Sequence, residues 1–283
     1  MPFKLLTISF ALFLFACQNT SSDKKEKPKA STKEEVQEEI QEKKAVPSET
    51  ARLITGSDSI LISKKKVVED YDRQWSVISY TFYDENLALS KWQKTINRFI
   101  RKSLYRQEEA KEYNEPLSKE LIRKVLLVFK KEARRYEDDM PWNIAENYQI
   151  DDAFKTFAVL KIESSLYTGG AHGSYGVGYY YFDKSSAKEL HIKDFIDTKK
   201  ELLRAAELVF RKKVGIKANT PFEETDYWFS DGFYLSDNFE ITDQGITFIY
   251  NPYEISNYAN GMIEFTLTKT QIEPFLKRKI DWK

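Results

Sequence analysis

The stretch Y-T-G-G-A-H-G at residues 167–173 decides the fold, because it is a glycine-rich loop between two strand-like segments. An apolar, β-rich run over residues 154–166 leads into the loop, and an alternating aromatic run over residues 175–182 leads out of it. Glycine adopts positive φ without strain, so the two runs predict a β-hairpin with a connection longer than two residues. The loop also holds one of the two histidines of the chain.

This loop has two interpretations. In the structural one, Gly169 and Gly170 turn a corner, and His172 is a hydrogen-bonded capping side chain. In the functional one, exposed backbone N–H groups, Tyr167 and His172 form a recognition surface, since glycine-rich loops present amides to anions and aromatic side chains anchor ligands. The residues predicted to bind a ligand or partner are Tyr167, Thr168, Gly169, Gly170, Ala171 and His172.

The other strand-like segments also arrive mostly as hairpins. Residues 143–150 and 154–164 flank Asp151-Asp152, and Ile241 and residues 246–250 flank T-D-Q-G. Alternating or β-branched runs at residues 75–83 and 262–267 predict two further strands. Hairpins with helices in between, rather than strict βαβ alternation, predict an α+β fold with antiparallel sheet.

Three segments have the spacing of amphipathic helices. Ser118 is a candidate N-cap for the second, and Thr198-x-x-Glu201 reads as a capping box for the third. The predicted apolar stripes are Leu89, Trp92, Ile96, Phe99 and Ile100; Leu121, Val125, Val128, Phe129 and Tyr136; and Leu202, Ala206, Val209, Phe210 and Val214. We therefore expect antiparallel β-hairpins packed with three main amphipathic helices.

The start of the sequence has the features of an export signal. Lys4 precedes a short apolar run, and Leu14-Phe15-Ala16-Cys17 resembles a bacterial lipobox, in which cleavage before the cysteine is followed by its lipidation. An ordinary secretory signal with an incidental cysteine is the alternative. We expect residues 1–17 to be a lipoprotein signal, and lipidated Cys17 to hold the protein on the membrane of a bacterial cell envelope, in the periplasm or facing the surface.

Composition divides the rest of the sequence, after residue 17, into a polar segment and a longer body. Residues 18–50 are rich in Lys, Glu, Ser, Thr, Gln and Pro and poor in large apolar residues, which predicts a disordered tether. Residues 51–283 are long enough to bury a core, and we divide them into an N-terminal half, 51–166, and a C-terminal half, 167–283.

Composition and spacing also restrict the chemistry. Lys plus Arg and Asp plus Glu are both 44, so the chain has no basic footprint for nucleic acid. The only cysteine is Cys17, which excludes a thiol nucleophile in the body and an intrachain disulfide. His172 and His191 lack metal-ligand spacing, and the G-x-S-x-G pattern is absent. We therefore assign no catalytic residue, metal or cofactor, although paired carboxylates remain open and Glu163 is the acid just before the loop.

Several segments together resemble one family. Y-T-G-G-A-H at residues 167–172 is similar to the signature of an extracytoplasmic domain shared by RsiV-like anti-sigma factors and the N-terminal part of PdaC-like deacetylases. Phe182-Asp183, K-E-L at 188–190 and D-F-I at 194–196 resemble the stretch that follows. T-D-x-G-I-x-F from Thr242 and N-P-Y-E-I from Asn251, followed by Gly261 and Glu264, resemble the family's C-terminal half.

The resemblance implies an α+β domain outside the cytoplasm and, in RsiV-like proteins, binding of lysozyme as a signal. It does not extend to the sigma-binding or deacetylase parts of those proteins, so we expect neither activity here. The expected function is a lipid-anchored envelope binding module for a protein, with a lysozyme-like hydrolase as one candidate, or for a cell-wall glycan. The alternatives are an enzyme acting on envelope carbohydrate through His172 or a nearby acid, and a purely structural lipoprotein.

Overall fold

A computed structural model describes residues 51–63, 74–105, 115–134 and 142–282 of the chain. They belong to one compact unit, Glu49–Lys283. The expected signal with Cys17, the tether over residues 18–50 and Tyr136 lie outside the described residues. Within the described residues, every helix is too short or too polar to cross a bilayer.

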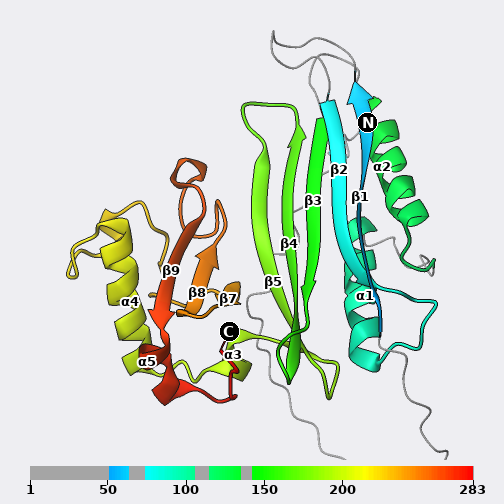
Figure 1. Cartoon of the computed structure of the whole chain (residues 1–283). Coiled ribbons are helices and arrows are strands. Elements are labelled where there is room, and N and C mark those ends of the chain that lie inside the picture. Colours follow the sequence, from blue (N-terminus) through cyan, green and yellow to red (C-terminus); the bar gives the residue numbers. More distant parts are fainter. Residues whose placement is uncertain (1–50, 64–73, 106–114, 135–141, 283) are drawn as a thin grey trace, which may run out of the picture. The chain divides into compact units, whose positions relative to one another are not determined.

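Six strands form the larger sheet, in the order β1-β2-β3-β4-β5-β6 (Figure 1). They are β1 Leu53–Ser63, β2 Gln74–Tyr83, β3 Trp142–Asp151, β4 Phe157–Thr168, β5 Ser174–Asp183 and β6 Glu189–Leu190. The predicted hairpins β3–β4 and β4–β5 are confirmed, with Leu166 opposite Ser174 beside the glycine loop. The α+β class is thereby confirmed, with largely antiparallel pairing.

Two features of this sheet differ from the prediction. β2 and β3 are parallel, because the chain between them contains helices α1 and α2 and returns to the starting end of the sheet. β1 was not predicted, since Gly56, serines and an aspartate give it weak β propensity. Its pairing with β2 overrides that propensity, and the Tyr80 ring lies over Gly56, where an added Cβ would stand 2.7 Å from the Tyr80 hydroxyl oxygen.

Helices α1, Lys91–Tyr105, and α2, Lys119–Ala133, pack on one face of this sheet and bury its first core. Ser118 is the N-cap of α2, as predicted, and its hydroxyl accepts a hydrogen bond from the Leu121 N–H. The predicted stripe of α2 is partly wrong: Val128 is 60% exposed, whereas Ile122 and Leu126 are buried. The face of α2 that packs on the sheet is rotated toward Ile122. The sequence does not predict which face is buried, because α2 has apolar residues on several sides.

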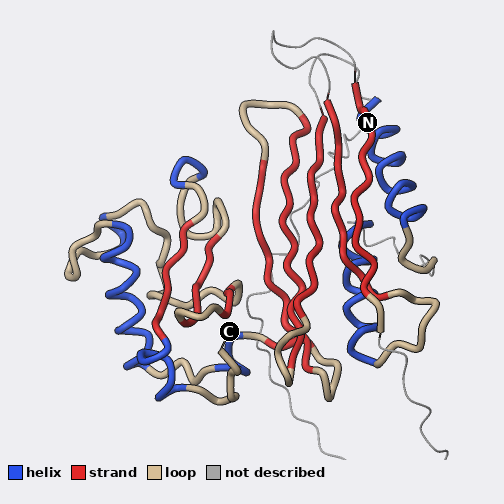
Figure 2. The backbone as a smooth tube through the Cα atoms, viewed as in Figure 1, coloured by secondary structure: helices blue, strands red, loops and turns tan. Residues whose placement is uncertain are grey.

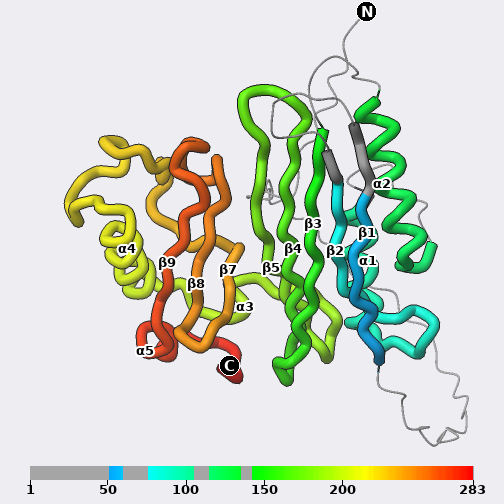
Figure 3. Tube along the Cα trace, turned by 45° about the horizontal axis from the view of Figure 1, so that its top comes forward, coloured from blue at the N-terminus to red at the C-terminus, as the bar shows by residue number. Residues whose placement is uncertain are grey.

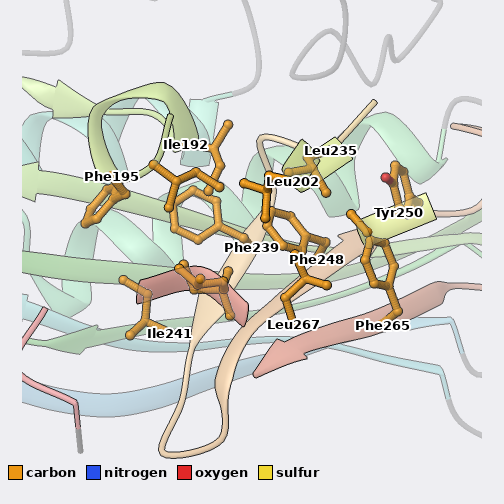
Figure 4. Packing of buried hydrophobic residues seen from close by; sticks show 14 of the residues in the cluster. Ile192, Phe195, Leu202, Leu235, Phe239, Ile241, Phe248, Tyr250, Phe265 and Leu267 are labelled. Atoms are coloured by element: carbon orange, nitrogen blue, oxygen red, sulfur yellow. The ribbon is translucent and has the colours of Figure 1, made fainter. Parts of the chain in front are cut away.

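The C-terminal part forms a second core around three antiparallel strands, in the order β7-β8-β9 (Figures 3 and 4). The strands are β7 Phe239–Ile241, β8 Gly245–Tyr250 and β9 Ile263–Thr268; the helices are α3 Ile192–Phe195, α4 Lys200–Val214 and α5 Lys269–Ile272, with 3-10 turns η2 Phe222–Glu224, η3 Tyr258–Asn260 and η4 Glu273–Phe275. The core is strongly aromatic, and Phe210 of α4 contacts the Phe265 ring of β9. The predicted hairpin around T-D-Q-G is confirmed as β7–β8.

The capping box predicted at Thr198 is not the start of α4. The N-cap is Lys199, and its side chain makes no capping hydrogen bond. The backbone before the helix makes other hydrogen bonds. The Asp197 N–H donates to the Phe275 carbonyl, and the Lys199 N–H donates to the Asp197 carbonyl. The helix therefore begins at Lys200, after this tertiary contact.

The two sheets are joined along the outer edge of β5 by two asparagine side chains. Asn251 accepts from the Val177 N–H at 2.9 Å and donates to the Val177 carbonyl at 3.0 Å. Asn238 accepts from the Tyr179 N–H at 3.0 Å and also donates to the Val177 carbonyl, at 2.8 Å. The amides thus take the place of a neighbouring strand, which satisfies backbone groups that would be costly to bury unpaired.

Two further contacts fix this joint. The hydroxyl of fully buried Tyr181 donates to the Phe239 carbonyl at 2.8 Å, and its ring stacks on Phe239 at a centroid distance of 4.5 Å. At Gly176 an added Cβ would lie 2.8 Å from the Asn251 side-chain oxygen. Glycine is therefore required there for the asparagine to reach β5.

Asn251 is itself held by Glu254, whose carboxylate accepts from the Asn251 N–H at 2.9 Å. Burial raises the pKa of Glu254 to about 7, against the opposing effect of its bonds from Asn251. The carboxyl group is therefore partly protonated near neutral pH in the folded chain.

We expect Asn251→Ala to lower the free energy of unfolding by about 1–3 kcal/mol, since it leaves the buried Val177 N–H without its acceptor and the Val177 carbonyl with Asn238 as its remaining amide donor. Urea unfolding monitored by tryptophan fluorescence measures the change. Asn260→Ala, at an exposed position, is the control and should stay within about 0.5 kcal/mol of the native chain. Equal stability of the two variants would show that the asparagine joint contributes nothing.

A second prediction concerns pH. The pKa of Glu254 is raised in the folded chain, so its contribution to stability is fully present below the unfolded value of 4.5 and is lost as pH rises through about 7. We expect the unfolding free energy of the native chain to fall, relative to that of Glu254→Gln, between pH 5 and pH 8. Urea unfolding of both proteins at several pH values measures the difference, in which the titration of other groups cancels. Parallel pH profiles would contradict the assignment.

Candidate functional site

The glycine loop connects the ends of the long β4–β5 hairpin (Figure 2). Gly169 and Gly170 both have φ of 94°, a region that side chains with a Cβ rarely adopt. A Cβ built on Gly170 would meet no described heavy atom within 4 Å, so glycine is required there for conformation rather than for space. The Tyr167 hydroxyl donates to the Gly170 carbonyl at 2.9 Å and braces the loop from its own first residue.

His172 is exposed, and its tautomer follows from its contacts. Nδ1 lies 2.8 Å from the Gly173 carbonyl oxygen, which can only accept, so Nδ1 carries the hydrogen. In the neutral ring Nε2 is therefore the acceptor, and the Tyr253 hydroxyl lies 3.4 Å from it. Nδ1 therefore faces a backbone carbonyl, and Nε2 faces a phenol.

His172 belongs to a group of rings that we call the aromatic cluster: His172, Tyr175, Tyr253 and Tyr258. The His172 ring stacks on Tyr258 at a centroid distance of 3.9 Å and an interplanar angle of 16°. Tyr258 also meets Tyr175 edge-on at 5.9 Å and Tyr253 at 5.6 Å. Tyr175 and Tyr253 are 39% and 56% exposed, so the cluster presents large aromatic surface to solvent.

Tyr253 has a backbone conformation that is unfavourable for its residue type. Its φ is 72°, in the left-handed region, where a bulky residue is an outlier strained by about 1–3 kcal/mol. The adjacent bond from the Asn251 N–H to Glu254 closes the turn and holds this conformation. This strained backbone conformation places the exposed Tyr253 ring beside His172.

The structure thus brings only part of the predicted site together. Tyr167 and His172 have the contacts described above, Gly169 and Gly170 supply the turn, Thr168 ends β4 opposite Trp142, and Ala171 is exposed. Tyr175, Tyr253 and Tyr258 also belong to this site, although no sequence pattern predicts them there. In the N-P-Y-E-I motif, Asn251 bonds to β5 and Glu254 closes the turn that carries Tyr253.

The face of the larger sheet opposite α1 and α2 is hollowed next to the aromatic cluster. A hollow of about 470 Å³ is lined by residues of β2, β3, β4 and β5, among them Tyr175, and by Met262. Asn147 donates to Glu163 at 2.9 Å, and Lys161 pairs with the same carboxylate at 2.8 Å. The bond from Lys161 is the main reason why the pKa of Glu163 lies below its ordinary value, so this acid stays ionised.

A second hollow, of about 420 Å³, lies on the same face and is lined by Gln149, Lys161, Tyr179 and Glu240 among others. Burial, followed by the nearby Glu240, raises the pKa of Tyr179 well above its ordinary value, so the phenol stays neutral. Lys161 lines this hollow and Glu163 the first one, so their ion pair stands where the two hollows meet.

The other histidine is in a structural setting. His191 Nδ1 lies 2.6 Å from Asp237, whose second oxygen accepts from the Ile192 N–H at the start of α3. Among the described residues no group of three or more His, Cys, Asp or Glu side chains is placed to hold a metal ion.

The C-terminal part of the chain is similar to a known protein family. Residues 188–270 match the family described as "Protein of unknown function (DUF3298)". A DUF3298 family member from Bacteroides fragilis has a similar structure, with a TM-score of 0.57 and 19% identity over 81% of this chain and 95% of that one. A DUF3298 family protein from Pseudomonas aeruginosa is similar at a TM-score of 0.49 and 17% identity, over 81% and 96%.

A comparison with curated protein sequences finds no match. The matched segment begins after the glycine loop and includes α4, the three-stranded sheet and the N-P-Y-E-I turn. Residues 188–270 are therefore similar to the DUF3298 family, and the body has a fold similar to that of a DUF3298 family protein.

Proposed function

We propose that this protein is an envelope-anchored binding module whose contact surface is the aromatic cluster. The observation that carries the proposal is Tyr253, an exposed tyrosine kept at φ of 72° beside His172. Backbone strain of this kind concentrates at binding and catalytic sites. Exposed Tyr and His rings supply large contact area with a polar tip, which suits recognition.

The contacts favour binding over catalysis. Hydrolysis by His172 would need a nucleophile or water activated at Nε2 and an acid to orient the ring. Its Nε2 faces the Tyr253 phenol and its Nδ1 a backbone carbonyl. Glu163, the nearby acid, has a lowered pKa and is engaged by Lys161 and Asn147, which makes it a poor proton donor.

The proposed place of action and the proposed class of ligand are both supported by the sequence. The lipobox-like residues around Cys17 and the charged tether support a lipid-anchored module outside the cytoplasm, in the periplasm or facing the surface. The resemblance to RsiV-like and PdaC-like extracytoplasmic domains supports a ligand met in the envelope. A lysozyme-like hydrolase is the protein candidate, and a cell-wall glycan is the other.

We expect Tyr253→Gly to weaken ligand binding at least tenfold while leaving stability within about 1 kcal/mol. Glycine relieves the strain at positive φ, and this gain offsets the lost ring contact and the larger backbone entropy of the unfolded chain. The measurement pairs urea unfolding with binding to lysozyme and to purified peptidoglycan, using the chain from residue 17 onward with Cys17→Ser.

His172→Ala should act in the same direction, because it removes the ring stacked on Tyr258. Leu127→Ala, on the exposed side of α2, is the control and should bind like the native chain. Full affinity in both Tyr253→Gly and His172→Ala would exclude the aromatic cluster as the contact surface.

The anchor has its own test. In the full-length chain, Cys17→Ser should move the protein from the membrane fraction to the soluble fraction or leave it unprocessed, because the lipid cannot be attached. Fractionation and electrophoretic mobility distinguish these outcomes from wild-type behaviour. A variant that fractionates and migrates like the native protein would rule out lipidation at Cys17.

A further inference from the structure

The open face of the larger sheet carries polar, mostly uncharged side chains in register across four strands. Ser79 of β2 is opposite Asn147 of β3, which is opposite Glu163 of β4, which is opposite Val177 of β5. Since neighbouring strands lie about 4.8 Å apart, this row spans roughly 14 Å. The face is neither an apolar core nor a fully solvated surface, because Ser79, Asn147 and Glu163 are each partly buried.

The next row continues this face to the aromatic cluster. Val77, Ala145, Ser165 and Tyr175 follow one another across the same four strands. Tyr175 both lines the first hollow and meets Tyr258 edge-on. The hollow and the exposed rings are therefore parts of one continuous surface.

One cation and several carboxylates line this surface. Lys161 and Glu163 form an ion pair at 2.8 Å, and Lys161 also lies 5.8 Å from the centre of the Tyr179 ring. The Asn147 amide donates to the same carboxylate. The second hollow is also lined by Asp151 and Glu240, so the two hollows offer hydroxyl, amide and phenol groups together with an excess of carboxylates.

These features select among ligand classes. A nucleic acid or another polyanion would need an excess of cations, whereas carboxylates outnumber cations along the lining of the two hollows. A peptide added as a strand beside the aromatic cluster would need a free edge on β5, whereas Asn238 and Asn251 occupy that edge at Val177 and Tyr179. Sugars have hydroxyl groups for polar side chains and flat C–H faces for exposed rings. Hollows of about 470 and 420 Å³ are within the usual size of small-ligand sites.

We propose that the hollows of the open sheet face, together with the aromatic cluster, bind a neutral oligosaccharide. The proposal rests on the proposed function and names its ligand class. The rings of the cluster stack on a sugar at one end, and Ser79, Asn147, Gln149 and Tyr179 lie along the polar path across the sheet.

The test measures binding of chitotetraose to the chain from residue 17 onward with Cys17→Ser, by isothermal titration calorimetry. Ala145→Tyr fills the first hollow without removing a polar contact and should weaken binding at least tenfold. Thr55→Tyr adds the same ring at an exposed position on the same face of edge strand β1 and should change affinity less than twofold. Tyr253→Gly should also weaken binding tenfold.

A loss of binding in Ala145→Tyr could also result from a folding defect. The binding surface is therefore also mapped by NMR on the protein that lacks this substitution. In two-dimensional amide NMR, chitotetraose should shift the resonances of Ala145, Asn147, Glu163 and Val177 more than those of β1. Shifts confined to other surfaces, full affinity in Ala145→Tyr, or no binding at millimolar sugar would each overturn the proposal.

The remaining outcomes separate this proposal from the proposed function. If lysozyme binds, Tyr253→Gly abolishes that binding and chitotetraose does not bind, the module stands but the oligosaccharide site is wrong. If chitotetraose binds and Ala145→Tyr abolishes it while Tyr253→Gly has no effect, the hollow is an oligosaccharide site and the aromatic cluster is not its platform. In that case the proposed contact surface fails.

Discussion

The rest of the structure depends on how the edge of β5 is satisfied. An exposed strand edge offers unpaired N–H and C=O groups and would pair with any available strand. Here the Asn238 and Asn251 amides bond those groups at Val177 and Tyr179, so the three-stranded sheet joins β5 through side chains. The arrangement depends on Gly176, because a Cβ there would collide with Asn251.

The aromatic cluster is a consequence of this joint. Asn251 begins the turn that carries Tyr253, and Glu254 closes it through the Asn251 N–H. Since Asn251 is bound to β5 near the start of that strand, the turn lies next to the loop that precedes β5. A structural need, capping a sheet edge, therefore also positions the exposed rings beside His172. The raised pKa of Glu254 makes the same turn sensitive to pH near neutrality.

Much of the fold could be predicted because local patterns agreed with the tertiary structure. The β3–β4, β4–β5 and β7–β8 hairpins follow from alternating runs with turn residues between them, and α2 begins at Ser118 for a local reason. The predictions from sequence are wrong or incomplete where contacts with a distant segment determine the local structure. β1 forms by pairing with β2 despite weak propensity, and α4 starts late because the preceding backbone bonds to Phe275.

The sequence by itself determined the α+β class, the hairpins and the need for glycine at a loop that contains His172. Only the tertiary structure decided what His172 faces, since Tyr253 lies 81 residues away along the chain. Neither the positive φ of Tyr253 nor the position of Asn251 on β5 has a periodic signal, because both depend on contacts between elements rather than on neighbours in sequence. The local half of the site was therefore visible in the sequence, and the aromatic half was not.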